Sequence, residues 1–115
     1  MSRPLVYACS GYSSAAQLAN RLALELDAEG HAEMSCIAGV GGGVKPLVKV
    51  ATSGRRIVAL DGCPLSCVQA CLAGVGVEPD VHHVLSELGV VKKRASQVGD
   101  EQAEAVKRVV LESLG

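Results

Sequence analysis

Four short apolar runs alternate with segments of helical spacing along this chain of 115 residues. The runs, which we expect to be strands, lie at residues 5–8, 31–37, 57–60 and 81–85. Strands that alternate with helices predict a parallel sheet with helices on both faces. Right-handed crossovers then favour the strand order 2-1-3-4. The expected fold is a three-layer, Rossmann- or flavodoxin-like α/β domain with a short, mostly parallel sheet, formed by the whole chain, residues 1–115.

The segments between these runs predict four helices and one loop. The helices are expected near residues 14–29, 46–51, 64–74 and 100–114. Ser14 and Gln17 have the spacing of a capping box at the start of the first helix. Pro64 suits the first position of the third helix, which places Cys63 just before it. Residues 39–43, almost all glycine, are expected to form a flexible loop.

Composition and charge limit the classes of partner. The chain has no Trp or Phe and a net charge of −1, so it offers neither a base-stacking surface for nucleic acid nor a basic footprint for an anionic membrane. Its start lacks the apolar core of a signal peptide, and no apolar run approaches the roughly 20 residues of a spanning helix. We therefore expect a cytoplasmic protein, in which five cysteines serve metal or redox chemistry rather than disulfides.

The cysteines are placed where such chemistry can assemble. Cys9 and Cys63 follow two apolar runs, and Cys36 lies at the end of a third that neighbours them in the predicted strand order; Cys67 lies one helical turn after Cys63. Because the carboxyl ends of parallel strands share one edge of a sheet, we expect these thiols to gather there. Zinc is held tetrahedrally by such ligands, at about 2.3 Å per sulfur. Cys71, a further turn along and about 12 Å from Cys63 if both lie on one helix, is predicted to be a packing residue.

Neighbouring groups are expected to tune these thiols. Helices that begin after Cys9 and Cys63, with backbone N–H groups of the glycine loop, predict stabilised thiolates and lowered thiol pKa values. Asp61 is expected to cap the turn that follows it. His82 and His83 point to opposite faces of their strand, so packing or surface roles are favoured over metal ligation. Residues 92–94 are expected to form a solvated basic surface.

Several motifs together resemble the DGC-domain proteins, small zinc-binding proteins of prokaryotes. The matching segments, which span nearly the whole chain, are Cys9-Ser10-Gly11, Gln17-Leu18-Ala19-Asn20, Cys36 with Ala38-Gly39, and Asp61-Gly62-Cys63-Pro64 with Cys67. The resemblance implies four chelating cysteines, which fall on Cys9, Cys36, Cys63 and Cys67. Cys71 lies outside that pattern.

The leading functional prediction is a protein that binds one Zn²⁺ or a similar soft metal ion per chain, through Cys9, Cys36, Cys63 and Cys67, for storage, delivery or sensing. One alternative is a thiol module in which an activated Cys63 or Cys9 exchanges disulfides or carries sulfur or selenium. Another is an iron–sulfur protein. Whether the chain is an enzyme stays open. A metal ion is the expected partner, protein partners stay open, and a homodimer is one way to cover the edges of a short sheet.

Overall fold

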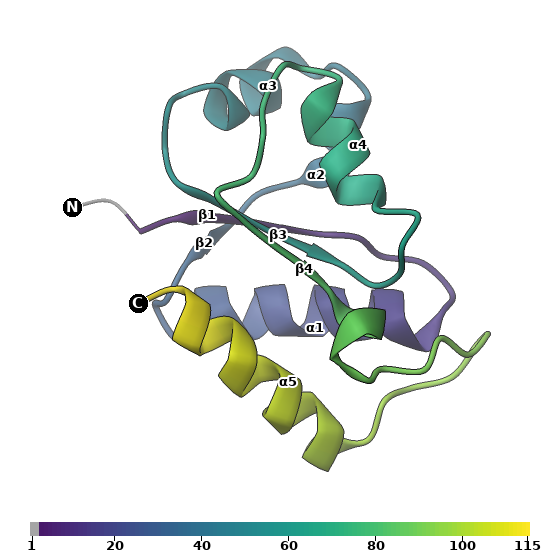
Figure 1. Cartoon of the computed structure of the whole chain (residues 1–115). Coiled ribbons are helices and arrows are strands. Elements are labelled where there is room, and N and C mark those ends of the chain that lie inside the picture. Colours follow the sequence, from purple (N-terminus) through teal and green to yellow (C-terminus); the bar gives the residue numbers. More distant parts are fainter. Residues whose placement is uncertain (1–2) are drawn as a thin grey trace.

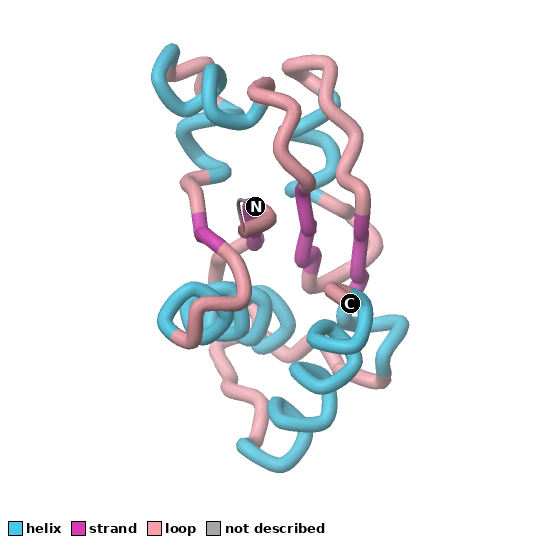
Figure 2. The backbone as a smooth tube through the Cα atoms, turned by 90° about the vertical axis from the view of Figure 1, so that its left-hand side faces the viewer, coloured by secondary structure: helices cyan, strands magenta, loops and turns pink. Residues whose placement is uncertain are grey.

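The computed structural model describes residues 3–115, so residues 1 and 2 of the predicted domain lie outside it. The sheet consists of β1 (Leu5–Ala8), β2 (Glu33–Met34), β3 (Ile57–Asp61) and β4 (Val81–Val84). Its strands are all parallel, in the order β2-β1-β3-β4 (Figures 1 and 2). The predicted fold class and strand order are confirmed.

Helices cover both faces of this sheet. One face carries α1 (Ser14–Ala28) and α5 (Asp100–Ser113), and the other carries α2 (Ile37–Gly41), α3 (Lys45–Ala51) and α4 (Cys67–Ala73) (Figure 1). A short 3₁₀ helix, η1 (Leu85–Leu88), follows β4. Within residues 3–115, none of the helices is sufficiently long and apolar to pass through a membrane.

The sheet separates two aliphatic cores, because successive side chains of a strand point to opposite faces. Val6 of β1 packs with Leu22 of α1 and Val106 of α5. On the other face, Tyr7 packs with Val40 of α2 and Val68 of α4. The packing of Val68 therefore fixes the start of α4, where Cys67 lies, near the ends of β1 and β3.

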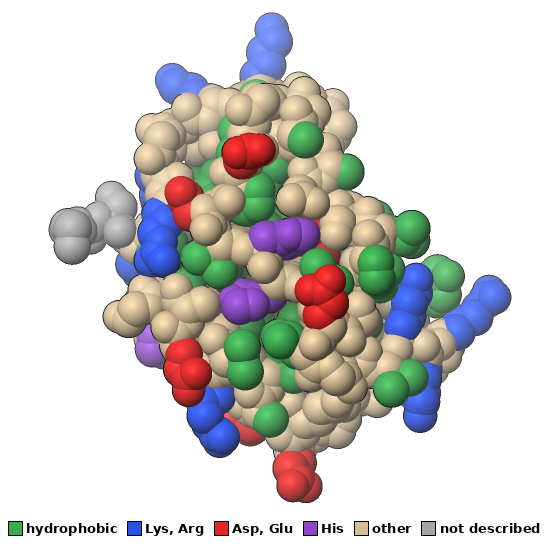
Figure 3. Space-filling model, in the orientation of Figure 1, with side chains coloured by type: hydrophobic (Ala, Val, Ile, Leu, Met, Phe, Trp, Pro, Cys, Tyr) green, Lys and Arg blue, Asp and Glu red, His purple; other side chains and the backbone are tan. Residues whose placement is uncertain are grey.

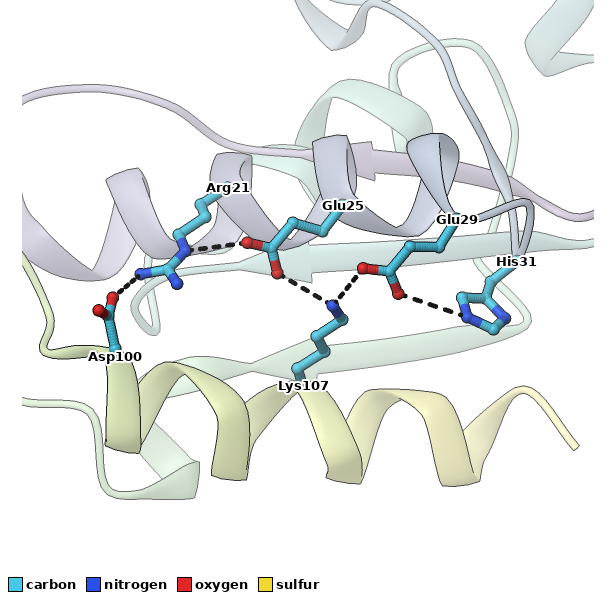
Figure 4. A network of polar contacts seen from close by, with 6 residues as sticks. All are labelled: Arg21, Glu25, Glu29, His31, Asp100 and Lys107. Carbon is cyan, nitrogen blue, oxygen red and sulfur yellow. Dashed lines mark hydrogen bonds and ion pairs between the residues drawn. The ribbon is translucent and has the colours of Figure 1, made fainter.

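A charged cluster joins α5 to α1 (Figure 4). The Lys107 ammonium lies 2.7 Å from Glu29 and 3.2 Å from Glu25, although the lysine side chain is only 9% exposed. Hydrogen bonding to Glu29 is the main cause that raises the pKa of Lys107, so the lysine stays charged. Arg21 contacts Glu25 and also reaches Asp100 at the start of α5. These pairs anchor α5, and with it one end of the connection that follows η1.

Three local predictions in the first half of the chain were wrong. The strand expected at residues 31–37 is limited to Glu33–Met34, because Cys36 and Ile37 already begin α2. The cap of α1 is Ser13, whose Oγ accepts from the Ala16 N–H at 3.1 Å, rather than Ser14. The glycine-rich segment is not a flexible loop, because its first half forms α2. A methyl group on Gly41 would lie 2.8 Å from Cys71 Sγ, so the glycine lets α2 pack closely on α4.

His83 makes the stability of this fold depend on pH. Its Nε2 lies 2.8 Å from Ser113 Oγ of α5, and burial lowers the pKa of the imidazole, with a smaller contribution from His82. The unfolded chain therefore binds a proton more readily than the folded chain. Stability should be fully present above the ordinary histidine pKa, about 6.5, and decline as the pH falls below it. Thermal unfolding should show a shallower decline in Tm from pH 7 to pH 5 for His83→Gln; an unchanged pH dependence would contradict this account.

Candidate functional site

Three of the four predicted ligand thiols line one cavity. Cys9, Cys63 and Cys67 border a space of about 190 Å³ at the carboxyl ends of β1 and β3. Cys9 directly follows β1, Cys63 lies in the turn after β3, and Cys67 is the first residue of α4. Cys9 and Cys63 are half-buried, Cys67 is exposed, and all five cysteines of the chain are free thiols. We call this space the thiol cavity.

Cys36 lies outside the thiol cavity. It is an exposed residue just before α2 and lines a neighbouring cavity of about 360 Å³. The two cavities share Ser10 in their linings. Across residues 3–115, no three side chains of His, Cys, Asp or Glu are grouped so that they could hold a metal ion. The sulfur donors suit a soft metal chemically, but their arrangement does not form a ligand shell.

Cys71 also stays away from the thiol cavity. It is half-buried on α4 and lines a groove with Gly41 of α2 and Gly74. Its packing against Gly41 agrees with the predicted role as a small packing residue. The predicted reason was wrong, however, because Cys63 does not lie on the same helix as Cys71.

The turn after Gly62 explains that difference. The predicted helix from Pro64 begins only at Cys67, because Ser66 has a left-handed backbone with φ of 51°. The N–H groups of Val68 and Gln69 in its first turn donate to the Asp61 carboxylate, at 2.8 Å and 3.3 Å. The positive end of the α4 dipole was predicted to stabilise the thiolates. The Asp61 carboxylate already offsets that partial charge.

Asp61 is the buried support of this turn. It is 1% exposed, and it caps α4, whereas a cap of the turn directly after it was predicted. Its carboxylate also lies 2.8 Å from His82 Nε2. The pairing of Ala59 with His82 in the parallel register puts His82 and Asp61 on the same face of the sheet. This contact of His82 was not predicted. Strand alternation alone indicated that only one of the two histidines faces this side.

The thiols of the cavity have different electrostatic surroundings. Burial raises the pKa of Cys9, opposed by the Gly62 N–H that donates to its sulfur at 3.1 Å, and the predicted lowering of this pKa was wrong. Lys92 Nζ donates to Cys63 Sγ at 3.5 Å. Lys92 was predicted on a solvated surface, and its contact with the Cys63 thiol was not predicted.

The chain matches one protein family over most of its length. The model of the DGC domain matches residues 5–110, and the chain belongs to this family. Among curated proteins, the anaerobic and virulence modulator AnvM of Pseudomonas aeruginosa is 59% identical over 101 residues, which cover 88% of this chain and 77% of that protein. No solved structure matches the chain.

Proposed function

We propose that this chain binds a soft metal ion such as Zn²⁺ through Cys9, Cys63 and Cys67, with Cys36 as the fourth donor. The observation that supports this proposal is the presence of three thiols on one cavity at the carboxyl edge of a parallel sheet. Thiolates are the preferred ligands of soft metals, and one zinc ion accepts four of them. Binding requires Cys36 to approach from the adjoining cavity.

Two hydrogen-bond donors lie against the sulfurs of the thiol cavity. The Gly62 N–H donates to Cys9 Sγ, and the Lys92 ammonium to Cys63 Sγ. Donors of this kind offset the negative charge that several thiolates bring to a metal site. The Pseudomonas relative is named a modulator, and we propose for this chain a role in sensing or delivering the metal.

Metal analysis of the purified protein tests this proposal. The full chain, expressed without added metal and kept reduced, should carry about one zinc per chain by mass spectrometry. The variants Cys9→Ser, Cys36→Ser, Cys63→Ser and Cys67→Ser should each lose most of it. Cys71→Ser is the matched control and should keep it. Metal-free protein with five titratable thiols, or equal loss in the control, would overturn the proposal; bound iron with a brown colour would favour the iron–sulfur alternative.

A second candidate function is thiol–disulfide exchange at Cys63. The observation that favours it is the contact between Lys92 Nζ and Cys63 Sγ, since reactive cysteines are typically found beside a cation. Cys9 is the weaker candidate of the two, because burial raises its pKa. Cys67, on the same cavity, is available to resolve a mixed disulfide on Cys63.

A further inference from the structure

A short segment, residues 91–95, borders the thiol cavity and is fixed to the start of α1. Ser14 Oγ donates to the Val91 carbonyl and accepts from the Lys93 N–H, both at 2.9 Å. The Ser14 N–H also donates to the Lys93 carbonyl at 2.7 Å, and the Ala95 N–H donates to the Tyr12 carbonyl at 2.8 Å. We call this segment the basic strap. Its backbone is held in place although its side chains are largely exposed.

The basic strap concentrates positive charge beside the cavity. It carries Lys92, Lys93 and Arg94 in succession, in a chain whose net charge is −1. Figure 3 shows Lys and Arg side chains gathered with apolar ones at the right of the view, where Figure 1 places the connection between η1 and α5. Arg94 lies 5.2 Å from the centre of the Tyr12 ring, which itself lines the cavity. Two of the three cations thus contact residues of the cavity lining.

Nothing acidic opposes this charge in the cavity lining. Its members are small, apolar or polar residues, the three thiols and Lys92, with no Asp or Glu among them. The nearby carboxylate of Asp61 is buried and already hydrogen-bonded by His82 and α4. Exposed Leu65 and Tyr12 give the mouth apolar contacts. The cavity therefore has the charge and lining that suit a small organic anion.

We propose that the thiol cavity takes small organic disulfides that carry carboxylates, and that the basic strap selects them for reaction with Cys63. This inference rests on the second candidate function, thiol exchange at Cys63, and adds the class of substrate. Lys92 lies at the reacting sulfur, whereas Lys93 and Arg94 attract the carboxylates from further out. Selection by charge in this way acts mainly on the rate of encounter.

The reaction is a simple exchange. The Cys63 thiolate attacks one sulfur of the incoming disulfide, and a new S–S bond joins that sulfur to Cys63 while the original S–S bond breaks. The other half leaves as a thiolate and takes a proton from water. Cys63 is oxidised to the mixed disulfide, and the leaving half is reduced. Cys67 or Cys9 can then attack the Cys63 sulfur and release the bound half as a second thiol.

The test compares three disulfides that differ in charge. Reduced, metal-free full-length protein is mixed with glutathione disulfide, neutral 2-hydroxyethyl disulfide or cationic cystamine, and the adduct on Cys63 is followed by mass spectrometry of the intact chain and its peptides. The anionic disulfide should react about tenfold faster than the neutral one, after correction for their rates with free cysteine, and the cationic one should be slowest. Added salt should reduce the anionic rate and leave the neutral rate unchanged.

Two double variants distinguish the contribution of the basic strap from that of the Cys63 thiol. The double variant Lys93→Gln/Arg94→Gln leaves Lys92 beside Cys63, so it should lower the rate with the anionic disulfide several-fold, and by a larger factor than the rate with the neutral one. Its matched control is Lys45→Gln/Lys49→Gln, which removes the same charge from α3. Equal rates for all three disulfides, or the same loss in the control, would overturn this inference alone. No reaction at Cys63 with any of them would overturn the exchange function as well, while the zinc measurement would stand separately.

Discussion

Replacement of Gly62 by alanine is expected to lower the free energy of unfolding by about 3 kcal/mol, and Tm by more than about 10 °C. A methyl group at this position would lie 2.7 Å from both the Ala15 carbonyl carbon and the Ala16 nitrogen of α1. These are backbone atoms, so α1 or the turn must shift as a whole. Because Gly62 also donates to Cys9 Sγ, the shift should disturb the thiol cavity. Chemical and thermal unfolding measure the effect.

Gly99→Ala is the matched control for this variant. A methyl group there meets nothing within 4 Å, and Gly99 has φ of −66°, which alanine adopts freely. Gly99 is the N-cap of α5, where alanine is less favourable than glycine, so the control should unfold within about 1 kcal/mol of the parent chain. Equal stability of the two variants would show that the turn after β3 adapts to a larger residue, contrary to the close packing described here.

Removal of the Asp61 carboxylate should be about as costly. Asp61→Ala leaves the N–H groups of Val68 and Gln69 and the ring of His82 without their common partner, in a site that is 1% exposed. We expect a loss of about 3 kcal/mol in the free energy of unfolding, since a buried charge network loses its centre. Cys67 begins the helix that Asp61 caps, so metal retention or thiol exchange should fall more than in a variant that is merely less stable.

Asp61→Asn and Asp100→Asn complete this experiment. Asp61→Asn keeps the shape of the side chain and one acceptor oxygen, so it should cost roughly half as much as the alanine variant. Asp100 is 92% exposed, and its change to asparagine should leave stability within about 0.5 kcal/mol. A measurement in which Asp61→Ala matches Asp100→Asn would contradict the supporting role assigned to the buried carboxylate.

The order of elements followed from local pattern. Residues 57–60 form a continuous apolar run and become part of the fully buried β3, and the helical spacing of residues 14–29 becomes α1. Handedness and short connections then left few strand orders, and the predicted one was confirmed. Strands and helices of this kind depend on residues that are close in sequence, so the sequence pattern alone predicts them.

The errors lie where distant residues decide the local structure. Gly39 and Gly41 suggested flexibility, but their small size lets α2 contact Leu47 and Cys71. The start of α4 is set by a left-handed Ser66 and by the Asp61 carboxylate, neither of which the helical spacing of the cysteines reveals.

Only part of the candidate site was predicted, because its remaining contacts also depend on residues that are distant in sequence. Strand ends brought Cys9, Cys63 and Cys67 to one cavity, as topology predicts, whereas Cys36 opens on the cavity beside it. The contact of Lys92 with Cys63 was not predicted, because it depends on a hydrogen bond from Ser14 to the Val91 carbonyl. These two residues are 77 positions apart in the sequence.

The shortness of β2 has a mechanical consequence. β2 is joined to β1 by two residue pairs at the edge of the sheet, while β1 and β3 are joined by four in its centre. Edge segments with few backbone hydrogen bonds detach at a smaller free energy than the rest of a protein. Cys36 lies two residues after this edge strand, so we expect its approach to the other three thiols to cost less free energy than opening the core of the protein. Amide hydrogen exchange should accordingly be fastest, among the strands, in β2.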